Sequence, residues 1–286
     1  MSERARVTGA YAVMCAIWGT TWLAIKLSLH YVPPITGVGV RFVLAGLVLA
    51  ALAAALGKRT TLAALPWHLV GVLAVFMFGI NYVLTYTAET HVGSGMTAVL
   101  FGTFPFFMFG FGRVAGERSG PLVWLGAAIA FGGVALIFLT SNVSGTPLYA
   151  LAAVGAALSS AYGNAYAKRH SHHDPLITLP AAMLLSGAAI TILGLMLEHP
   201  HPATALSLPS ILTICYLALL GSGAAFFLNL WLLQRVAAWI VGLSALIIPV
   251  IAVVVGVFAG GETFGPREIG GALLVIAGVW LALRST

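Results

Sequence analysis

The chain alternates long apolar runs with short breaks that are polar or rich in glycine and proline. A helix that crosses a bilayer needs about 20 mainly apolar residues, whereas a strand of a membrane barrel would alternate in polarity over about 10. The pattern therefore predicts an all-α integral membrane protein with ten transmembrane helices and no soluble domain between them. The predicted spans are 7–29, 35–56, 67–87, 95–112, 121–140, 147–167, 175–197, 208–233, 239–260 and 266–284.

The composition agrees with this pattern. Of the 286 residues, 60% are hydrophobic and 7% are charged, against roughly 25% charged in ordinary soluble domains. So few charges cannot cover a soluble core of this size, which excludes a cytosolic enzyme, a nucleic-acid-binding module and a disordered chain. The expected surroundings are a lipid bilayer, and no nucleic acid is expected as a partner. Cys15 and Cys215 lie in apolar runs, where a disulfide framework is not expected.

Basic residues gather in the breaks on one side of the predicted spans. Lys and Arg are enriched in the cytoplasmic loops of multi-pass membrane proteins. The first run is too long for the apolar core of a signal peptide, so it is expected to remain as a helix. Both termini are therefore predicted to be cytoplasmic, in a multi-pass protein of the cell membrane, with the bacterial inner membrane favoured. The basic residues on that side are Arg4, Arg6, Lys58, Arg59, Arg113, Arg118, Lys168, Arg169, Arg235 and Arg284.

The chain also contains an internal repeat of five spans. Trp18-Gly19 recurs as Tyr162-Gly163, and Pro105 recurs as Pro249, both 144 residues later. Further matches follow in order at a spacing of 145 residues. They are Gly116-Glu117 with Gly261-Glu262, Gly120-Pro121 with Gly265-Pro266, Gly126 with Gly271, and Gly133 with Gly278.

The number of spans in each copy decides how the copies are related. Because that number is odd, the second copy enters the membrane from the opposite face. The repeats are predicted to cover 1–142 and 147–286 and to be inverted, as in alternating-access carriers whose binding site lies near the midplane between the halves. A duplication that serves only helix packing is the alternative.

Two sets of residues resemble a known family. The first set, near the start of the chain, is Trp18-Gly19, Thr20-Thr21-Trp22, Lys26, Pro33-Pro34 and Arg41-Phe42. The second set occurs in both halves: Pro105 or Pro249 is followed by a Gly-Glu pair, a Gly-Pro turn and a glycine-rich run. In this order they resemble the EamA type of drug/metabolite transporter, and the chain looks most like the amino-acid exporters of the YddG type. The resemblance implies a ten-helix secondary carrier of small metabolites with cytoplasmic termini. The second half departs from the pattern, because Tyr162 replaces the tryptophan and nothing matches Arg41 well.

Lys26 and Arg41 are charged residues inside predicted spans. A charge at a helix centre costs ~2.5–3.5 kcal/mol on insertion scales. Arg41 is interpreted as a cation that faces the cavity and attracts a carboxylate, or that holds two helices together through backbone carbonyls. Lys26 either binds substrate or extends its ammonium group to the membrane interface. Both are candidate substrate-binding residues.

Polar and aromatic side chains inside the spans complete the predicted site. In hydrocarbon each polar group needs a partner, so these residues line a cavity, join neighbouring helices, or form a tyrosine belt at the interface. A lining of this kind suits a substrate that is partly apolar and partly zwitterionic. The candidates are Trp18 and Trp22 in the first span, Asn81, Tyr82 and Tyr86 in the third, and Tyr162, Asn164 and Tyr166 in the sixth. Asn229, in the eighth span, is interpreted as a helix-packing residue.

Pro105 and Pro249 lie in the middle of their predicted spans. Proline removes one backbone hydrogen bond and leaves a carbonyl of the preceding turn without its donor. Because the proline recurs in both halves, both residues are predicted to be hinges of the transport cycle. A static kink is the alternative.

These observations favour a secondary transporter that exports small metabolites, or lets them diffuse down their gradient, by alternating access. Amino acids, including aromatic and bulky apolar ones, are the favoured substrates. Glu and Asp residues fall at span ends or in loops, which disfavours a carrier of hydrophobic cations or drugs, the first alternative. The same placement disfavours coupling to protons through a buried carboxylate. The sequence leaves the oligomeric state open, a monomer included.

Enzymatic and metal-binding functions are disfavoured in the same way. A membrane-embedded enzyme, the more distant alternative, would need a nucleophile and a base, or metal ligands, at helical spacing inside the spans. The sequence has no His-Glu-x-x-His motif, no Ser-His pair and no acidic cluster there. No phosphate-binding loop occurs, so ATP is not expected to drive transport directly. The histidines at 170–173 and at 199–201 lie outside the spans. No cofactor and no metal site are therefore expected.

Overall fold

The structure is a computed structural model that describes residues 2–58, 60–92, 94–114, 116–117, 119–138, 147–260 and 265–284. For residues 94–96, 138, 256–260 and 268 it describes the backbone alone. The described residues form helices and connecting turns, with no strand among them. Arg59 and Arg118 of the predicted cytoplasmic loops, and Gly261-Glu262 of the predicted repeat, lie outside this part of the chain.

Several long helices run without interruption. They are α1 (Glu3–Ser28), α2 (Pro34–Ala55), α7 (Pro121–Phe138), α8 (Pro147–Arg169), α9 (Pro175–Leu197) and α15 (Pro266–Arg284). All except α1 begin with proline, whose fixed φ suits the first turn and whose missing N–H is not needed there. Carboxylates cap two of these starts. Glu198 accepts hydrogen bonds from the backbone N–H groups of Ile35 and Thr36 in α2, and Asp174 accepts one from Leu176 in α9.

Two longer stretches contain a π-helical segment between α-helical ends. The first consists of α3 (Trp67–Val72), η2 (Leu73–Ile80) and α4 (Asn81–Val92). The second consists of α11 (Leu208–Tyr216), η3 (Leu217–Ala224) and α12 (Ala225–Leu233). The two π-helical segments begin 144 residues apart, at Leu73 and Leu217. Such segments are frequent at functional sites.

Two other stretches are broken near the proline that each contains. Gly102-Thr103 separates α5 (Ser94–Phe101) from α6 (Phe104–Val114), and Leu243 separates α13 (Ala238–Gly242) from α14 (Ser244–Gly260). The short turns η1 (Leu62–Ala64) and α10 (Pro202–Ala205) lie in connections.

By length and composition, seven helical stretches of the described chain could cross a membrane. They are Glu3–Ser28, Pro34–Ala55, Trp67–Val92, Thr97–Val114, Pro175–Leu197, Leu208–Leu233 and Ala238–Val255. Two shorter apolar helices, Pro121–Ile137 and Ile269–Arg284, accompany them. The fold is therefore that of a multi-pass, all-helical membrane protein. The full set of ten spans and their inverted arrangement remain predictions.

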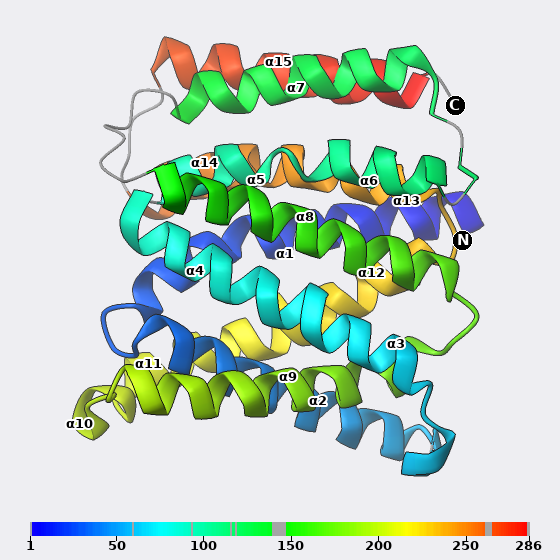
Figure 1. The fold of residues 1–286 in the computed structure, drawn as a ribbon. Helices are drawn as coiled ribbons and strands as arrows, with labels where there is room; N and C mark the ends of the chain where they lie inside the picture. The colour runs from blue at the N-terminus through cyan, green and yellow to red at the C-terminus, as the bar shows by residue number, and fades with distance from the viewer. Residues whose placement is uncertain are drawn as a thin grey trace.

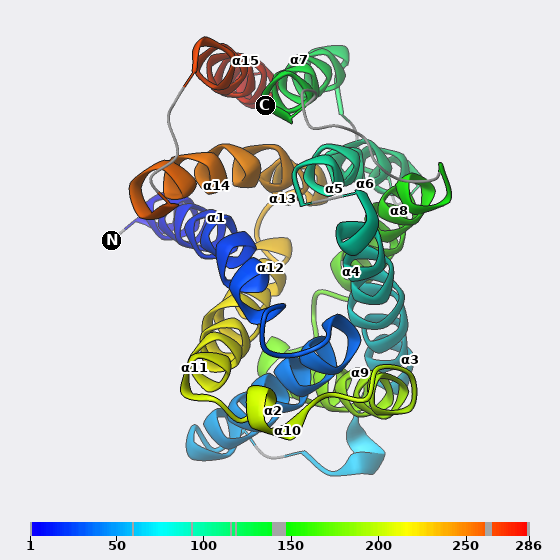
Figure 2. The same cartoon turned by 90° about the vertical axis from the view of Figure 1, so that its left-hand side faces the viewer.

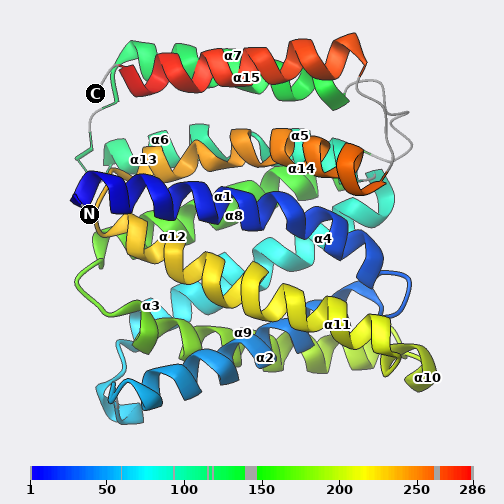
Figure 3. The same ribbon diagram turned by 180° about the vertical axis from the view of Figure 1, so that it is seen from behind.

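The helices run side by side along one common direction, as Figures 1 and 3 show from opposite sides. Figure 2 shows them end-on, with α2 and α9 at one pole of the bundle and α7 and α15 as an outer pair at the other. Between these poles, α1, α11 and α12 lie opposite α4 and α8, while α5, α6 and α14 lie next to the outer pair. This arrangement surrounds a central region with helices from both halves of the chain.

Glycines bring two pairs of helices into close contact. In α7 and α15, a Cβ added to Gly126 would collide with the carbonyl of Gly278, and a Cβ on Gly278 would collide with that of Gly126. Gly133 and Gly271 meet in the same reciprocal way, about two helical turns further along. Glycines in α2 and α9 likewise meet the backbone of the opposite helix. Small residues at these positions allow the backbones to approach closely, as in many membrane helix pairs.

The end of the bundle that holds both termini (Figure 1) also holds basic side chains from several helices. Lys168 donates hydrogen bonds to two backbone carbonyls at the end of α12. Lys58 pairs with Asp174, and Arg235 lies 3.7 Å from the carboxylate of Glu3. Lys58, Lys168 and Arg235, which the sequence assigns to one side, therefore lie at the same end of the molecule.

Candidate functional site

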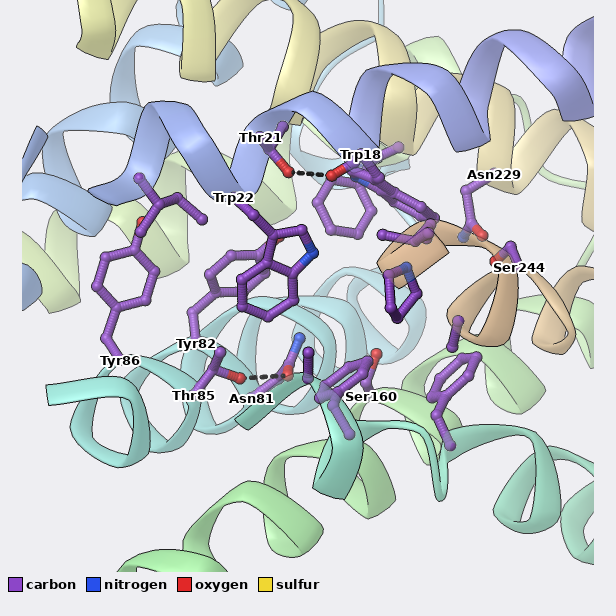
Figure 4. Close-up of a pocket in the computed structure, with 18 of the residues that line it drawn as sticks. Trp18, Thr21, Trp22, Asn81, Tyr82, Thr85, Tyr86, Ser160, Asn229 and Ser244 are labelled. Carbon is purple, nitrogen blue, oxygen red and sulfur yellow. Dashed lines mark hydrogen bonds between the residues drawn. The ribbon is translucent and has the colours of Figure 1, made fainter. Parts of the chain in front are cut away.

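A cavity of about 120 Å³ lies between helices of both halves, near the middle of their lengths. Figure 4 shows Trp18, Trp22 and Thr21 of α1 on one side of it and Asn81, Tyr82 and Thr85 of α4 on the other. Among the predicted residues, the cavity brings together Trp18, Trp22, Arg41, Asn81, Tyr82, Tyr86, Asn164 and Pro249. Their roles in binding and movement remain predictions.

Aromatic rings form much of the cavity wall. The indole of Trp18 meets the ring of Phe226 edge-on, with centroids 5.3 Å apart, and its Nε1 donates to the carbonyl of Gly221 at 3.2 Å. Tyr82 packs edge-on against Phe42 at 4.8 Å. An apolar cavity of roughly 150 Å³ in another protein holds benzene. The space here therefore has room for about one aromatic ring.

Arg41 of α2 contributes a buried cation to the same wall, with only 1% of its surface exposed. Its Nε donates to Oγ of Ser222 in η3 at 2.6 Å, whereas Nη1 has no hydrogen-bond partner among the described residues. The guanidinium carbon lies 5.3 Å from the ring centroid of Tyr82. A buried charged donor without a partner is costly, so this side chain is suited to receive an anionic group.

Amide side chains supply the other polar groups of the wall. Asn229 donates from Nδ2 to Oδ1 of Asn164 at 2.7 Å, and Asn164 donates to the carbonyl of Ser160 at 2.8 Å. On α4, Oγ1 of Thr85 donates to Oδ1 of Asn81 at 3.3 Å. Asn229 thus joins α12 to α8, as expected of a packing residue, and it also lines the cavity.

The two prolines occupy different positions relative to the cavity. Pro249 lies inside α14 and lines the cavity, whereas Pro105 is the second residue of α6 and is not part of the lining. Because proline has no N–H, residue 249 cannot donate to the carbonyl of Ala245 one turn earlier, and Ala245 also lines the cavity. The hinge roles of both prolines remain predictions, and this geometry favours Pro249.

Three predicted site residues lie away from the cavity. Lys26 is exposed in the last turn of α1, where its side chain can reach the interface. Tyr162 faces a groove on the surface of the bundle, where its ring packs on Phe76 with centroids 4.8 Å apart. Tyr166 lies near the end of α8, with its hydroxyl 3.3 Å from Nδ1 of His68. The geometry does not support a binding role for these residues in this cavity.

Sequence reasoning missed lining residues that the helical period could have revealed. Residues three or four apart share a helix face. Ser160 precedes Asn164 by four positions, Thr21 follows Trp18 by three, and Phe226 precedes Asn229 by three; all three missed residues line the cavity. Ser244, at the start of α14, also lines it, but no signal in the sequence singles it out.

Comparison with known proteins identifies the family. The sequence profile of the EamA-like transporter family matches residues 9–139 and again 147–284. The chain is 30% identical over 283 residues to YedA of Escherichia coli (strain K12), named an uncharacterized inner membrane transporter; the match covers 96% of this chain and 86% of YedA. It is 27% identical over 286 residues to a "probable amino-acid metabolite efflux pump" of Salmonella typhimurium, covering 94% of this chain and 92% of that protein.

A solved structure shares the fold. One protein crystal structure superimposes with a TM-score of 0.81 at 20% sequence identity, covering 97% of this chain and 96% of that one. The family match confirms the resemblance to the EamA type of transporter, and the names of the family and of the relatives indicate a transporter rather than an enzyme. The chain is a multi-pass membrane protein that belongs to the EamA-like transporter family.

Proposed function

We propose that this protein is a secondary transporter that exports amino acids, with aromatic and other bulky apolar ones among its substrates. The observation that carries the proposal is the combination of an aromatic wall and the buried guanidinium of Arg41 in one cavity. A free amino acid offers the matching combination of an apolar side chain and a carboxylate. The size of the cavity suits one ring or a branched aliphatic side chain.

The two charged groups of an amino acid have complementary groups in this wall. Nη1 of Arg41, which has no partner among the described residues, would donate to the substrate carboxylate in a charge-assisted hydrogen bond. The carbonyl of Ala245, which Pro249 leaves without its usual helical donor, would accept from the substrate ammonium group. Broken or proline-interrupted helices bind charged substrate groups in this way in other carriers.

The architecture proposed for transport is two inverted repeats of five helices, 1–142 and 147–286, that alternate around the cavity. Two features support it. The π-helical segments η2 and η3 start 144 residues apart, the spacing of the sequence repeat. In addition, the sequence repeat matches Gly126 with Gly271 and Gly133 with Gly278. The structure contains both the contact between Gly126 and Gly278 and the equivalent contact between Gly271 and Gly133.

The proposed location is the inner membrane of a bacterium, with both termini in the cytoplasm. The basic side chains at the end of the bundle that holds the termini support this orientation. The proposed direction is outward, and the name of the Salmonella relative, an efflux pump, is its support. A carrier of hydrophobic cations is disfavoured, because the described residues that line the cavity include a buried arginine and no acidic side chain.

Counterflow in proteoliposomes tests this proposal. Purified protein is reconstituted, the vesicles are loaded with an unlabelled amino acid, and uptake of labelled phenylalanine, leucine or alanine is followed at equal pH on both sides. We expect exchange of phenylalanine and leucine and little competition from phenylalanine amide, which lacks the carboxylate. Competition by tetraphenylphosphonium with none by amino acids would contradict the proposal and favour a cation carrier.

A further inference from the structure

Glu89 is an acidic residue in an unusual place. The sequence assigns it to the break after the third span, but α4 continues through it to Val92, and the residue is only 7% exposed. Its Oε2 atom has no hydrogen-bond partner among the described residues. At least one of the two carboxylate oxygens is thus buried without a hydrogen bond that would stabilise a negative charge.

The other acidic side chains that the structure describes all have polar partners. Glu198 caps α2 and Glu117 accepts hydrogen bonds from the backbone N–H of Ala238. Asp174 pairs with Lys58, and Glu3 lies near two arginines. Glu89 is therefore the exception among them, and the cost of an unpaired buried charge favours its neutral, protonated form in this conformation.

The position of Glu89 connects it to the cavity. It follows Thr85 by four residues and Tyr86 by three, so the three side chains share one face of α4, and Thr85 and Tyr86 both line the cavity. The hydroxyl of Tyr86 is close enough to interact electrostatically with both Glu89 and Arg41. Glu89 thus lies one helical turn beyond the substrate cavity.

Among the residues that the structure describes, the helices that pack on α4 place no cation in direct contact with Glu89. Leu84 meets Gly155 of α8, and His91 stacks on Tyr149 at 3.6 Å, so Glu89 lies at the level of residues 150–153 of α8, which are all apolar. Neither η2 nor the side chains described in α5 include an ionisable group. The titratable or charged groups that α2, α4 and α8 place around this region are Arg41, Tyr82, Tyr86, His91 and Tyr149.

We propose that Glu89 is a proton-binding site that couples transport to the pH gradient across the membrane. In the conformation described here the carboxyl group holds a proton. It takes up this proton from the external side. When the cycle exposes it to the cytoplasm, the O–H bond breaks, the proton passes to water, and the carboxylate becomes hydrated. An inward proton thereby accompanies each outward substrate molecule, and no bond in the substrate changes. The proposal rests on the proposed export function.

A pH titration followed by infrared spectroscopy tests proton binding without any substrate. We expect the band of a protonated, buried carboxyl group to be present near neutral pH in the wild type, to be missing in Glu89→Gln, and to be kept in Glu3→Gln, where an exposed acid is removed. The same band in Glu89→Gln, or no such band in the wild type, would overturn the proposal.

Transport measurements then test the coupling. For a one-to-one exchange, a pH gradient of one unit sustains a substrate gradient of about tenfold. Glu89→Gln should keep phenylalanine counterflow at equal pH and lose accumulation driven by the pH gradient, while Glu3→Gln should keep both. The proposal is overturned if the wild type ignores the pH gradient, if Glu89→Gln still follows it, or if Glu89→Gln loses counterflow as well. Absence of counterflow in the wild type would refute the proposed function instead, and the infrared titration would still decide whether Glu89 binds a proton.

Discussion

Helices α1 and α8 are the first helices of the two matching halves, yet they turn different faces to the cavity. α1 presents a stripe of residues three and four apart, including Trp18 and Trp22, whereas α8 presents Ser160 and Asn164. The sequence match aligns Trp18 with Tyr162, but Tyr162 lies in the surface groove. At 3.6 residues per turn, positions 160 and 162 point about 200° apart. Relative to the repeat, α8 is therefore rotated about its axis.

The glycine that follows each aromatic residue shows what the match does preserve. A Cβ on Gly19 would collide with Ile251 of α14, and a Cβ on Gly163 would come within 2.9 Å of the side chain of Met77 in η2. Both glycines mark close helix contacts, although with different neighbours. The repeated residues thus preserve positions of close helix packing. The two halves contribute unequally to the cavity, because its aromatic and cationic side chains come largely from the first half.

The sharpest test of this inequality is Arg41→Ala, for which we expect the largest effect. Truncating one partner of a buried charged hydrogen bond typically costs ~2–5 kcal/mol, which corresponds to a loss of about 30-fold or more in apparent affinity for a substrate that has a carboxylate. Arg41→Lys keeps the charge and should retain part of the activity. The measurement is the concentration dependence of phenylalanine counterflow. Equal activity of Arg41→Ala and the wild type would mean that the cation only joins α2 to η3.

The second prediction compares the two matched aromatics directly. Trp18→Ala removes part of the cavity wall and should weaken apparent affinity by roughly ten- to hundredfold, from a packing loss of ~1–3 kcal/mol. The loss should be larger for phenylalanine than for alanine, because the smaller substrate uses less of the wall. Tyr162→Ala should change the affinity by less than about twofold, since its ring lies outside the cavity. Equal losses of apparent affinity in Trp18→Ala and Tyr162→Ala would contradict the claim that only Trp18 of this matched pair lines the substrate site.

The third prediction concerns the matched prolines. Pro249→Ala restores a donor for the carbonyl of Ala245 and stiffens α14 beside the cavity, so we expect phenylalanine transport to slow by about tenfold. Pro105→Ala lies in the first turn of α6, where proline is easily replaced, and should slow transport much less. Rates are measured at saturating substrate with expression matched. A larger decrease in transport rate in Pro105→Ala than in Pro249→Ala would place the hinge in the first half instead.

The smallest effect is expected for Lys26→Ala. The side chain is exposed at the end of α1, where a long basic side chain reaches the interface, so transport should stay within about twofold of the wild type. The same counterflow assay measures it. Loss of transport in this variant would show that Lys26 takes part in transport although it lies away from the cavity.

Much of the fold could be predicted from the sequence, because continuous apolar runs have few other ways to satisfy their backbone in a membrane. The π-helical segments could not be predicted, since a shift in hydrogen-bond register leaves the hydropathy of 73–80 unchanged. The fall in hydropathy at Glu89 suggested a helix end, but the helix continues for one more turn. The sequence therefore predicts the ends of the helices only approximately.

The candidate site was partly predictable for a related reason. Trp18, Arg41, Asn81 and Tyr82 stood out because polar and aromatic groups are costly inside a span unless they have partners. The sequence places Tyr162 and Asn164 in the same predicted span, but residues two apart on a helix do not face the same side. The rotation of α8 depends on its packing against α4 and η2, and one sequence does not display that packing.

The central claim, that the cavity is where the substrate binds, is tested most directly by protection of an introduced thiol. In a background with Cys15→Ser and Cys215→Ser, Ser244→Cys places a thiol in the cavity, and Ser159→Cys places the same group in the surface groove beside Tyr162. We expect saturating phenylalanine to slow the reaction of a small methanethiosulfonate reagent with the Ser244→Cys variant and to leave its reaction with the Ser159→Cys variant unchanged. Protection of the Ser159→Cys variant, or none in a transport-active Ser244→Cys variant, would contradict the claim.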